Sequence, residues 1–297
     1  MERDGRTLPH FLIIGGMKCG STTLFRDLEE HPGVFFPLDK EPGNLCDDGV
    51  LTQRGLDRYA AHFRGAKHDA VCGEASTNYT KRPAYEGVPA RAREALGPDL
   101  RLIYVMRDPI ARLVSHHSHD GSRGVLPTDP EGALEQEPGL IEYSRYAYQL
   151  EPWIEAFGRG CIMAVRFEDY TEDRAAHAAR VCAHIGVEPI EGMIDPSRVH
   201  NRSVAKPVPS DAWRAVINSS LYRNTIRRFI PRDVKDRLRH ALLPKSTFTP
   251  DPLPRALVER LVTEFEQDQA HLRGLLGPDA PSWDLRARWL DDARSPA

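Results

Sequence analysis

The stretch HFLIIGGMKCGSTT, residues 10–23, decides the fold of this chain. Residues 11–15 are apolar and predict a buried strand, the glycines predict a tight turn, and Leu24, Phe25 and Leu28 predict a helix with one apolar face. A strand, turn and helix in this order direct several backbone N–H groups, and the positive end of the helix dipole, at one small volume. That volume suits a phosphate group.

This turn differs in one respect from the nucleotide-binding loop that it resembles in spacing. Gly15 and Gly20 are placed as in the P-loop pattern, but the position of the P-loop lysine holds Ser21. The lysine lies earlier in the turn, as Lys18. We therefore expect the loop to hold a phosphate other than the γ-phosphate of a nucleoside triphosphate.

The composition is that of an ordinary globular protein. The 297 residues are 40% hydrophobic and 28% charged, and the net charge of −3 gives no reason to expect a nucleic-acid partner. The five cysteines are an odd number without a CxxC pair, so neither a disulfide framework nor a zinc site is expected. Because the N-terminus is too charged for a signal sequence and the apolar run after it is too short to span a membrane, we expect a cytoplasmic protein.

Short apolar strands alternate with helical patterns, which is typical of a parallel sheet wrapped by helices. The predicted strands are residues 11–15, 34–36, 70–73, 100–106 and 161–166, and the predicted helices are residues 22–30, 109–117, 144–157, 174–185 and 255–276. Irregular structure is predicted for residues 121–139, 201–210 and 243–254. The expected fold class is α/β: a P-loop-type three-layer fold with a central, mostly parallel sheet flanked by helices, in a single domain over residues 1–297.

A second strand and turn repeat the first arrangement later in the chain. Residues 102–106, LIYVM, lead into Arg107, Asp108 and Pro109, and a helical pattern follows. Arg107 stands where the strand ends, which is where α/β folds bind ligands. Ser115 falls about two turns into the helix, at ~3.6 residues per turn. Arg107 and Ser115 are therefore candidates for binding a second phosphate.

With these two motifs the chain resembles the sulfotransferases that use 3′-phosphoadenosine 5′-phosphosulfate (PAPS). Residues 18–23, KCGSTT, resemble the family's 5′-phosphosulfate loop, and residues 107–115, RDPIARLVS, match its 3′-phosphate motif R-D-P-x-x-R-x-x-S at every fixed position. The motifs come in the family's order, each in a strand–turn–helix context. The resemblance implies PAPS as cofactor, adenosine 3′,5′-bisphosphate (PAP) as its product, and no need for a metal ion.

Four further segments resemble members of this family. Residues 166–170, RFEDY, correspond to the family's Y-E-D-L stretch, which is mainly structural there. Residues 40–42, KEP, are similar to a segment of the heparan-sulfate-type O-sulfotransferases in which the glutamate is the catalytic base. Residues 73–79, GEASTNY, resemble the G-E-x-[ST]-x-x-Y segment of the same branch. Residues 198–206 are similar to a late loop that closes over the nucleotide in many bacterial members.

The resemblance assigns roles to these residues. Glu41 is the expected general base, which contributes on the order of 10²–10⁴-fold, and Lys18 is expected to stabilise charge on the bridging phosphate oxygen. The residues expected to bind the cofactor are Lys18, Cys19, Gly20, Ser21, Thr22, Thr23, Arg107, Ser115, Asn201, Arg202 and Lys206.

Several alternatives stay open. Glu74 is either a second acidic contact with the substrate or a hydrogen-bonded buried carboxylate, and Glu74 or a histidine is the alternative to Glu41 as the base. Arg112 either supports the structure or contacts phosphate. His116 and His119 share a helix face, and the acceptor site or a helix end suits them better than zinc, because no third ligand is evident. The expected acceptor is a hydroxyl on a carbohydrate, a glycosylated compound or a lipidic natural product. The alternative functions are a P-loop kinase for a nucleotide or small molecule, and a non-catalytic PAP-binding protein.

Overall fold

The computed structural model describes residues 2–3, 5–38, 40–195 and 248–291, and the chain divides into two compact units. The larger unit consists of Met1–Leu113, Pro138–Asn201 and Leu253–Ala297, and the smaller of Val114–Glu137 and Arg202–Pro252. The single domain expected over residues 1–297 stays a prediction.

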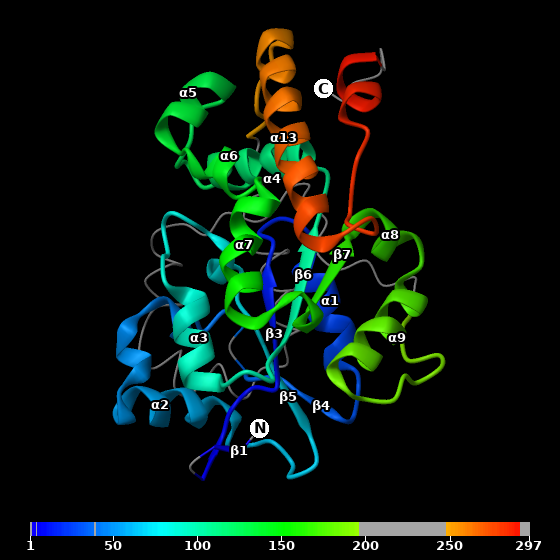
Figure 1. Cartoon of the computed structure of the whole chain (residues 1–297). Helices are drawn as coiled ribbons and strands as arrows, with labels where there is room; N and C mark the ends of the chain where they lie inside the picture. The colour runs from blue at the N-terminus through cyan, green and yellow to red at the C-terminus, as the bar shows by residue number, and fades with distance from the viewer. Residues whose placement is uncertain (1, 4, 39, 196–247, 292–297) are drawn as a thin grey trace. The chain divides into compact units, whose positions relative to one another are not determined.

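A five-stranded parallel sheet forms the centre of the larger unit (Figure 1). Its strands, in order across the sheet, are β4 (Val34–Phe35), β5 (Val71–Ala75), β3 (Phe11–Gly15), β6 (Arg101–Met106) and β7 (Ile162–Arg166). An antiparallel pair, β1 (Glu2–Arg3) and β2 (Arg6–Thr7), precedes them in the chain. The five strand positions predicted from the sequence are confirmed, apart from small differences at their ends.

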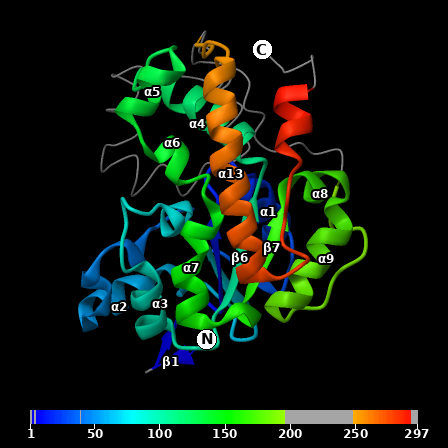
Figure 2. The ribbon, with the colours of Figure 1, turned by 45° about the horizontal axis from the view of Figure 1, so that its top comes forward.

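Helices cover both faces of this sheet. Figure 1 shows α1 (Ser21–Glu29) and α9 (Arg174–Ile185) on one face, and α3 (Val88–Leu96) and α7 (Tyr146–Phe157) on the other. The 22-residue helix α13 (Arg255–Leu276) packs along α7 (Figure 2). Further helices of the larger unit are α2 (Gln53–Ala60), α6 (Gly139–Glu142) and α8 (Phe167–Glu172), and α4 (Pro109–Gly121) begins in this unit and ends in the smaller one. The three layers confirm the predicted α/β fold class.

The stretch that predicts the fold lies in the middle of the sheet. Residues 11–14 of β3 are fully buried, because the strand has neighbours on both sides and helices on both faces. Leu24, Phe25 and Leu28 form the buried face of α1, as their helical spacing predicts. Among the residues that the structure describes, no helix combines the length and the apolar composition that a membrane span requires.

The chain reverses its direction across the sheet beside β3. From β3 it passes through α1 to β4 and β5 on one side, and then crosses to β6 and β7 on the other. The connections that leave the carboxyl ends of the neighbouring strands β3 and β6 therefore diverge. Such a switch point is where open α/β sheets bind ligands. Both predicted phosphate motifs begin there.

The irregular structure predicted for residues 121–139 is wrong in part, because the stretch contains α5 (Pro130–Gln136) and the first residue of α6. Asp129 caps α5 by accepting a hydrogen bond from the Gly132 N–H at 2.7 Å, and Pro130 is its first residue. The proline and acidic residues that indicate a loop thus form the start of a short helix. Residues 248–254 are irregular, as predicted, whereas residues 201–210 lie outside the described residues.

Candidate functional site

The first predicted phosphate loop connects β3 with α1. Gly20 precedes α1 with a φ of 87°, and a Cβ atom there would lie 2.3 Å from the Phe167 ring, so only glycine fits. The backbone N–H groups of Ser21 and Thr22 begin α1 and have no hydrogen-bond acceptor within the described residues. The loop therefore presents unpaired donors at the positive end of a helix, as an anion site requires.

Cys19 faces the protein interior from this loop. It is fully buried, and its Sγ atom lies 3.5 Å from the Tyr146 hydroxyl. Burial raises the pKa of the Cys19 thiol, so the side chain stays protonated and fills space. The Cys19 N–H donates to the Gly16 carbonyl at 3.1 Å. The cofactor contact expected of Cys19 stays a prediction.

Glu41 lies beside the same loop. Its carboxylate accepts hydrogen bonds from Lys40 Nζ at 3.0 Å and from Thr77 Oγ1 at 3.2 Å. Lys40 Nζ also donates to Thr22 Oγ1, at 2.9 Å, at the start of α1. The backbone N–H of Glu41 donates to the carbonyl of Ala75, the last residue of β5. These contacts fix the expected base next to the expected phosphate loop.

Lys18 and Glu41 share an unusual backbone conformation. Their φ angles are 67° and 63°, and in the described part of the chain they are the only residues other than glycine with a positive φ. This left-handed conformation costs of order 1–3 kcal/mol for such residues and clusters at functional sites. The two residues expected to be catalytic are therefore also the two that the backbone holds in an unfavourable conformation.

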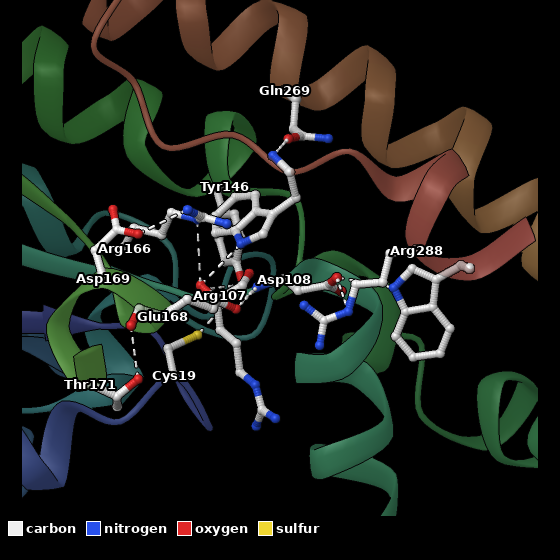
Figure 3. Close-up of polar contacts among 12 residues, drawn as sticks. Cys19, Arg107, Asp108, Tyr146, Arg166, Glu168, Asp169, Thr171, Gln269 and Arg288 are labelled. Atoms are coloured by element: carbon white, nitrogen blue, oxygen red, sulfur yellow. Dashed lines mark hydrogen bonds and ion pairs between the residues drawn. The ribbon is translucent and has the colours of Figure 1, made fainter. Parts of the chain in front are cut away.

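Arg107 follows the carboxyl end of β6, beside β3. Its guanidinium lies over the Phe167 ring, 5.4 Å from the ring centroid, and the same ring packs against Gly20. No acceptor among the described residues lies within hydrogen-bond distance of the guanidinium, and Figure 3 shows the side chain extending away from the polar contacts around it. Its charge is therefore available to an anion.

Ser115 lies on α4, in the part that belongs to the smaller unit. Its Oγ atom is buried and has no hydrogen-bond partner among the described residues. Ser118 of the same helix instead donates to the Val114 carbonyl at 2.9 Å, as helical serines often do. Because a buried hydroxyl without a partner is costly, the Ser115 side chain has the features of a ligand contact.

Glu74 lies inside β5 and is fully buried. Its two carboxylate oxygens accept hydrogen bonds from the hydroxyls of Tyr59 and Tyr79. Burial raises the pKa of Glu74 from 4.5 to about 7, although the two hydroxyl donors lower it. Of the two interpretations of Glu74, this placement favours the hydrogen-bonded buried carboxylate. A contact of Glu74 with the acceptor stays a prediction.

Glu74 also makes the stability of the protein depend on pH. A carboxyl whose pKa is raised by folding stabilises the folded chain below its unfolded pKa, and this contribution is lost as the pH rises through about 7. We therefore expect Glu74→Gln to become more stable relative to the original chain as the pH rises from 4.5 to about 7. Over this pH range the difference in the free energy of unfolding between the two proteins changes by about 3 kcal/mol. Urea unfolding of both proteins across this pH range measures it, and a difference that stays constant with pH would contradict it.

Other polar residues of α4 have partners within the protein. His116 is buried, and its Nε2 lies 3.0 Å from Asp120 Oδ2 one turn later. Arg112 is fully buried and donates to Ser144 Oγ at 2.5 Å, so it supports the structure. Contacts of His116 and the half-buried His119 with an acceptor stay predictions. No group of three or more His, Cys, Asp or Glu in the described ranges could hold a metal ion. Three residues expected to bind the cofactor lie outside the described residues: Asn201, Arg202 and Lys206.

Three residues that the structure places at this site are not among the site residues that the sequence predicts. Lys40 and Thr77 hold Glu41, and both belong to segments that the sequence analysis singled out by resemblance. The Phe167 ring contacts both Gly20 and the Arg107 guanidinium. Its position directly after the predicted strand of residues 161–166 could have indicated it, because residues that follow parallel strands meet at one edge of the sheet.

Comparisons with known proteins identify the family of this chain. The model of the sulfotransferase family matches residues 44–191, which include the Arg107 motif. Heparan sulfate glucosamine 3-O-sulfotransferase 6 of Mus musculus is 24% identical over 294 residues, which cover 94% of this chain and 75% of that protein. Heparan sulfate glucosamine 3-O-sulfotransferase 3A1 of Mus musculus is 27% identical over 202 residues, which cover 64% of this chain and 49% of that protein.

A solved structure shares the fold. The sulfotransferase from Alicyclobacillus acidocaldarius superimposes with a TM-score of 0.59 at 22% identity, over 92% of this chain and 97% of that chain. The present chain is a member of the sulfotransferase family. It spans about half the length of several curated relatives that it matches.

Proposed function

We propose that this chain transfers the sulfuryl group of PAPS to an acceptor hydroxyl. One observation supports the proposal most strongly: the α1 loop, Glu41 and Arg107, each from a different motif, lie close together at the carboxyl edge of the sheet. Glu41 is joined to the start of α1 through Lys40, and Arg107 lies on the ring that covers Gly20 of the same loop. Membership of the sulfotransferase family supports the same function.

The donors at this edge fit the anionic groups of PAPS. The unpaired N–H groups of Ser21 and Thr22, with Lys18, suit the 5′-phosphosulfate. The Arg107 guanidinium suits the 3′-phosphate. When bound, PAPS supplies an activated sulfuryl group on a phosphate leaving group.

Each residue acts on a charge or on a proton. Glu41 takes up the proton of the acceptor hydroxyl as that oxygen attacks, while Lys40 and Thr77 hold its carboxylate. Lys18 stabilises negative charge on the oxygen of the leaving phosphate. Sulfuryl transfer, like phosphoryl transfer, demands an aligned nucleophile and a stabilised leaving group rather than covalent chemistry by the protein.

The acceptor class that we propose is a hydroxyl on a carbohydrate, a glycosylated compound or a lipidic natural product. Residues 40–42 resemble the O-sulfotransferases that act on glycans. The relatives that this chain resembles, heparan sulfate and carbohydrate sulfotransferases, support the same class of acceptor.

Calorimetric titration with PAP in the presence of EDTA tests the cofactor. We expect binding without metal, weakened roughly tenfold or more in Arg107→Ala, because a charge-assisted hydrogen bond is lost. A parallel titration uses ATP with magnesium. Binding of ATP only, and only with magnesium, would overturn the proposal in favour of a kinase.

Turnover tests the chemistry separately. PAP formation from PAPS is measured with a panel of hydroxyl acceptors that contains a polysaccharide, a glycolipid and a simple alcohol. Formation of a sulfate ester on any of them supports the proposal. Binding of PAP without transfer to any acceptor of the panel would indicate a non-catalytic PAP-binding protein.

A further inference from the structure

The peptide group between Arg107 and Asp108 is held from both sides (Figure 3). Its carbonyl oxygen accepts a hydrogen bond from the Tyr146 hydroxyl at 2.6 Å, and its N–H donates to Glu168 Oε1 at 3.0 Å. A peptide plane held through both polar atoms cannot turn without breaking one of the two bonds. These contacts therefore set the direction in which Arg107 leaves the end of β6.

The carboxylate of Asp108 has donors from two distant parts of the chain. It is fully buried, and its Oδ1 accepts the Ala111 N–H at 2.8 Å in the first turn of α4. Its Oδ2 accepts the Trp289 indole N–H at 3.0 Å and lies 3.3 Å from Arg288 Nε. A buried carboxylate needs such donors to remain charged and in place. Two of these three donors come from residues 288 and 289.

The carboxylate of Glu168 depends on the same segment. Its Oε2 accepts the Trp283 indole N–H at 3.0 Å, while its Oε1 holds the peptide after Arg107. Trp283 is buried, and its backbone N–H donates to Gln269 Oε1 of α13 at 2.7 Å. Residues 283–289 therefore join α13 to both carboxylates that adjoin Arg107.

From these contacts we propose that the side chains of Trp283, Arg288 and Trp289 position Arg107 for the 3′-phosphate of the cofactor. The inference rests on the proposed function, because the 3′-phosphate is the ligand assigned to Arg107 there. Without the indole donors, Asp108 and Glu168 rearrange to find other partners. The Arg107 guanidinium, which the Phe167 ring supports from one side, then loses its fixed direction.

Trp289→Phe tests this role, because it removes the indole N–H and keeps an aromatic ring. We expect its affinity for PAP to fall roughly five- to tenfold. Its affinity for adenosine 5′-phosphate, which lacks the 3′-phosphate, should not change. In a chain that already carries Arg107→Ala, Trp289→Phe should cause no further loss, since the residue that it positions is gone. Calorimetry on the original chain, both single variants and the double variant gives the comparison.

Two further variants complete the experiment. Arg286→Ala is the matched control, because this side chain belongs to the same segment but is 58% exposed and pairs with Glu266 at 2.8 Å. Its affinities for PAP and for adenosine 5′-phosphate should equal those of the original chain. Arg288→Gln removes the second donor to Asp108 from a side chain that is 49% exposed, so the test survives if Trp289→Phe fails to fold. It should also lose affinity for PAP only.

The outcomes separate the inference from the proposed function. Three outcomes overturn the inference alone. The first is an equal loss of affinity for PAP and for adenosine 5′-phosphate, and the second is a loss of PAP affinity that Trp289→Phe still causes in the Arg107→Ala chain. The third is an unchanged PAP affinity in both Trp289→Phe and Arg288→Gln. Failure of the original chain to bind PAP overturns both.

Discussion

We expect Glu41→Gln to lower kcat by roughly 10²–10⁴-fold and to leave the affinity for PAP unchanged. The amide has the size of the carboxylate, and its carbonyl oxygen still accepts a hydrogen bond from Lys40 or Thr77. It does not take up the proton of the acceptor hydroxyl. Lys40 Nζ, and not Glu41 itself, contacts Thr22 at the start of α1. The N–H groups of the α1 loop, which are proposed to bind the cofactor, therefore stay in place. Initial rates of PAP formation give kcat, and calorimetry gives the affinity.

The control for this result is Glu155→Gln, the same substitution at an exposed position of α7. Its kcat and its affinity for PAP should equal those of the original chain. Full turnover in Glu41→Gln would remove Glu41 as the base. A loss of PAP affinity as large as the loss of kcat would assign it to cofactor binding instead.

Lys18→Ala should lower kcat by about 10²–10³-fold. The substitution removes the ammonium group expected to stabilise charge on the leaving phosphate. Lysine and alanine both disfavour the left-handed φ of 67° at this position, so the backbone preference hardly changes. Single-turnover rates with saturating PAPS report on the chemical step, and PAP affinity is measured in parallel.

Lys67→Ala, at an exposed lysine, is the matched control for the loss of one positive charge and should retain full activity. An unchanged kcat with weaker PAP binding in Lys18→Ala would mean that Lys18 holds the ground state and the transition state equally. We would then assign the stabilisation of charge on the leaving phosphate to the N–H groups of Ser21 and Thr22 instead of Lys18.

The parts of this structure that local sequence encodes could be predicted. β3 and α13 have the bounds that the sequence predicts, because one is a short apolar run ended by glycine and the other a long amphipathic pattern preceded by proline. Both predicted phosphate motifs follow predicted strands, and parallel strands bring their carboxyl ends to one edge of the sheet. The meeting of Arg107 with the loop around Gly20 followed from that rule.

The parts that depend on distant contacts could not be predicted. Thr77 and Lys40 hold Glu41 because β5 and the start of α1 bring them together, and neither residue type indicates this by itself. Glu74 follows a predicted strand in the sequence, but the sheet buries it beneath Tyr59 and Tyr79. Residues 130–136 were predicted to be irregular but form α5, because an Asp-Pro pair begins helices as well as turns.

The contact between Trp289 and Asp108 joins residues that are 181 positions apart. A ribosome completes the sheet strands and both phosphate motifs well before it reaches Trp289. Contacts of such long separation also close late in folding, since the entropy of the intervening chain opposes them. If Trp283, Arg288 and Trp289 position Arg107, a nascent or truncated chain can build its sheet and still bind the nucleotide weakly. Tight binding would then report that synthesis of the chain has passed Trp289.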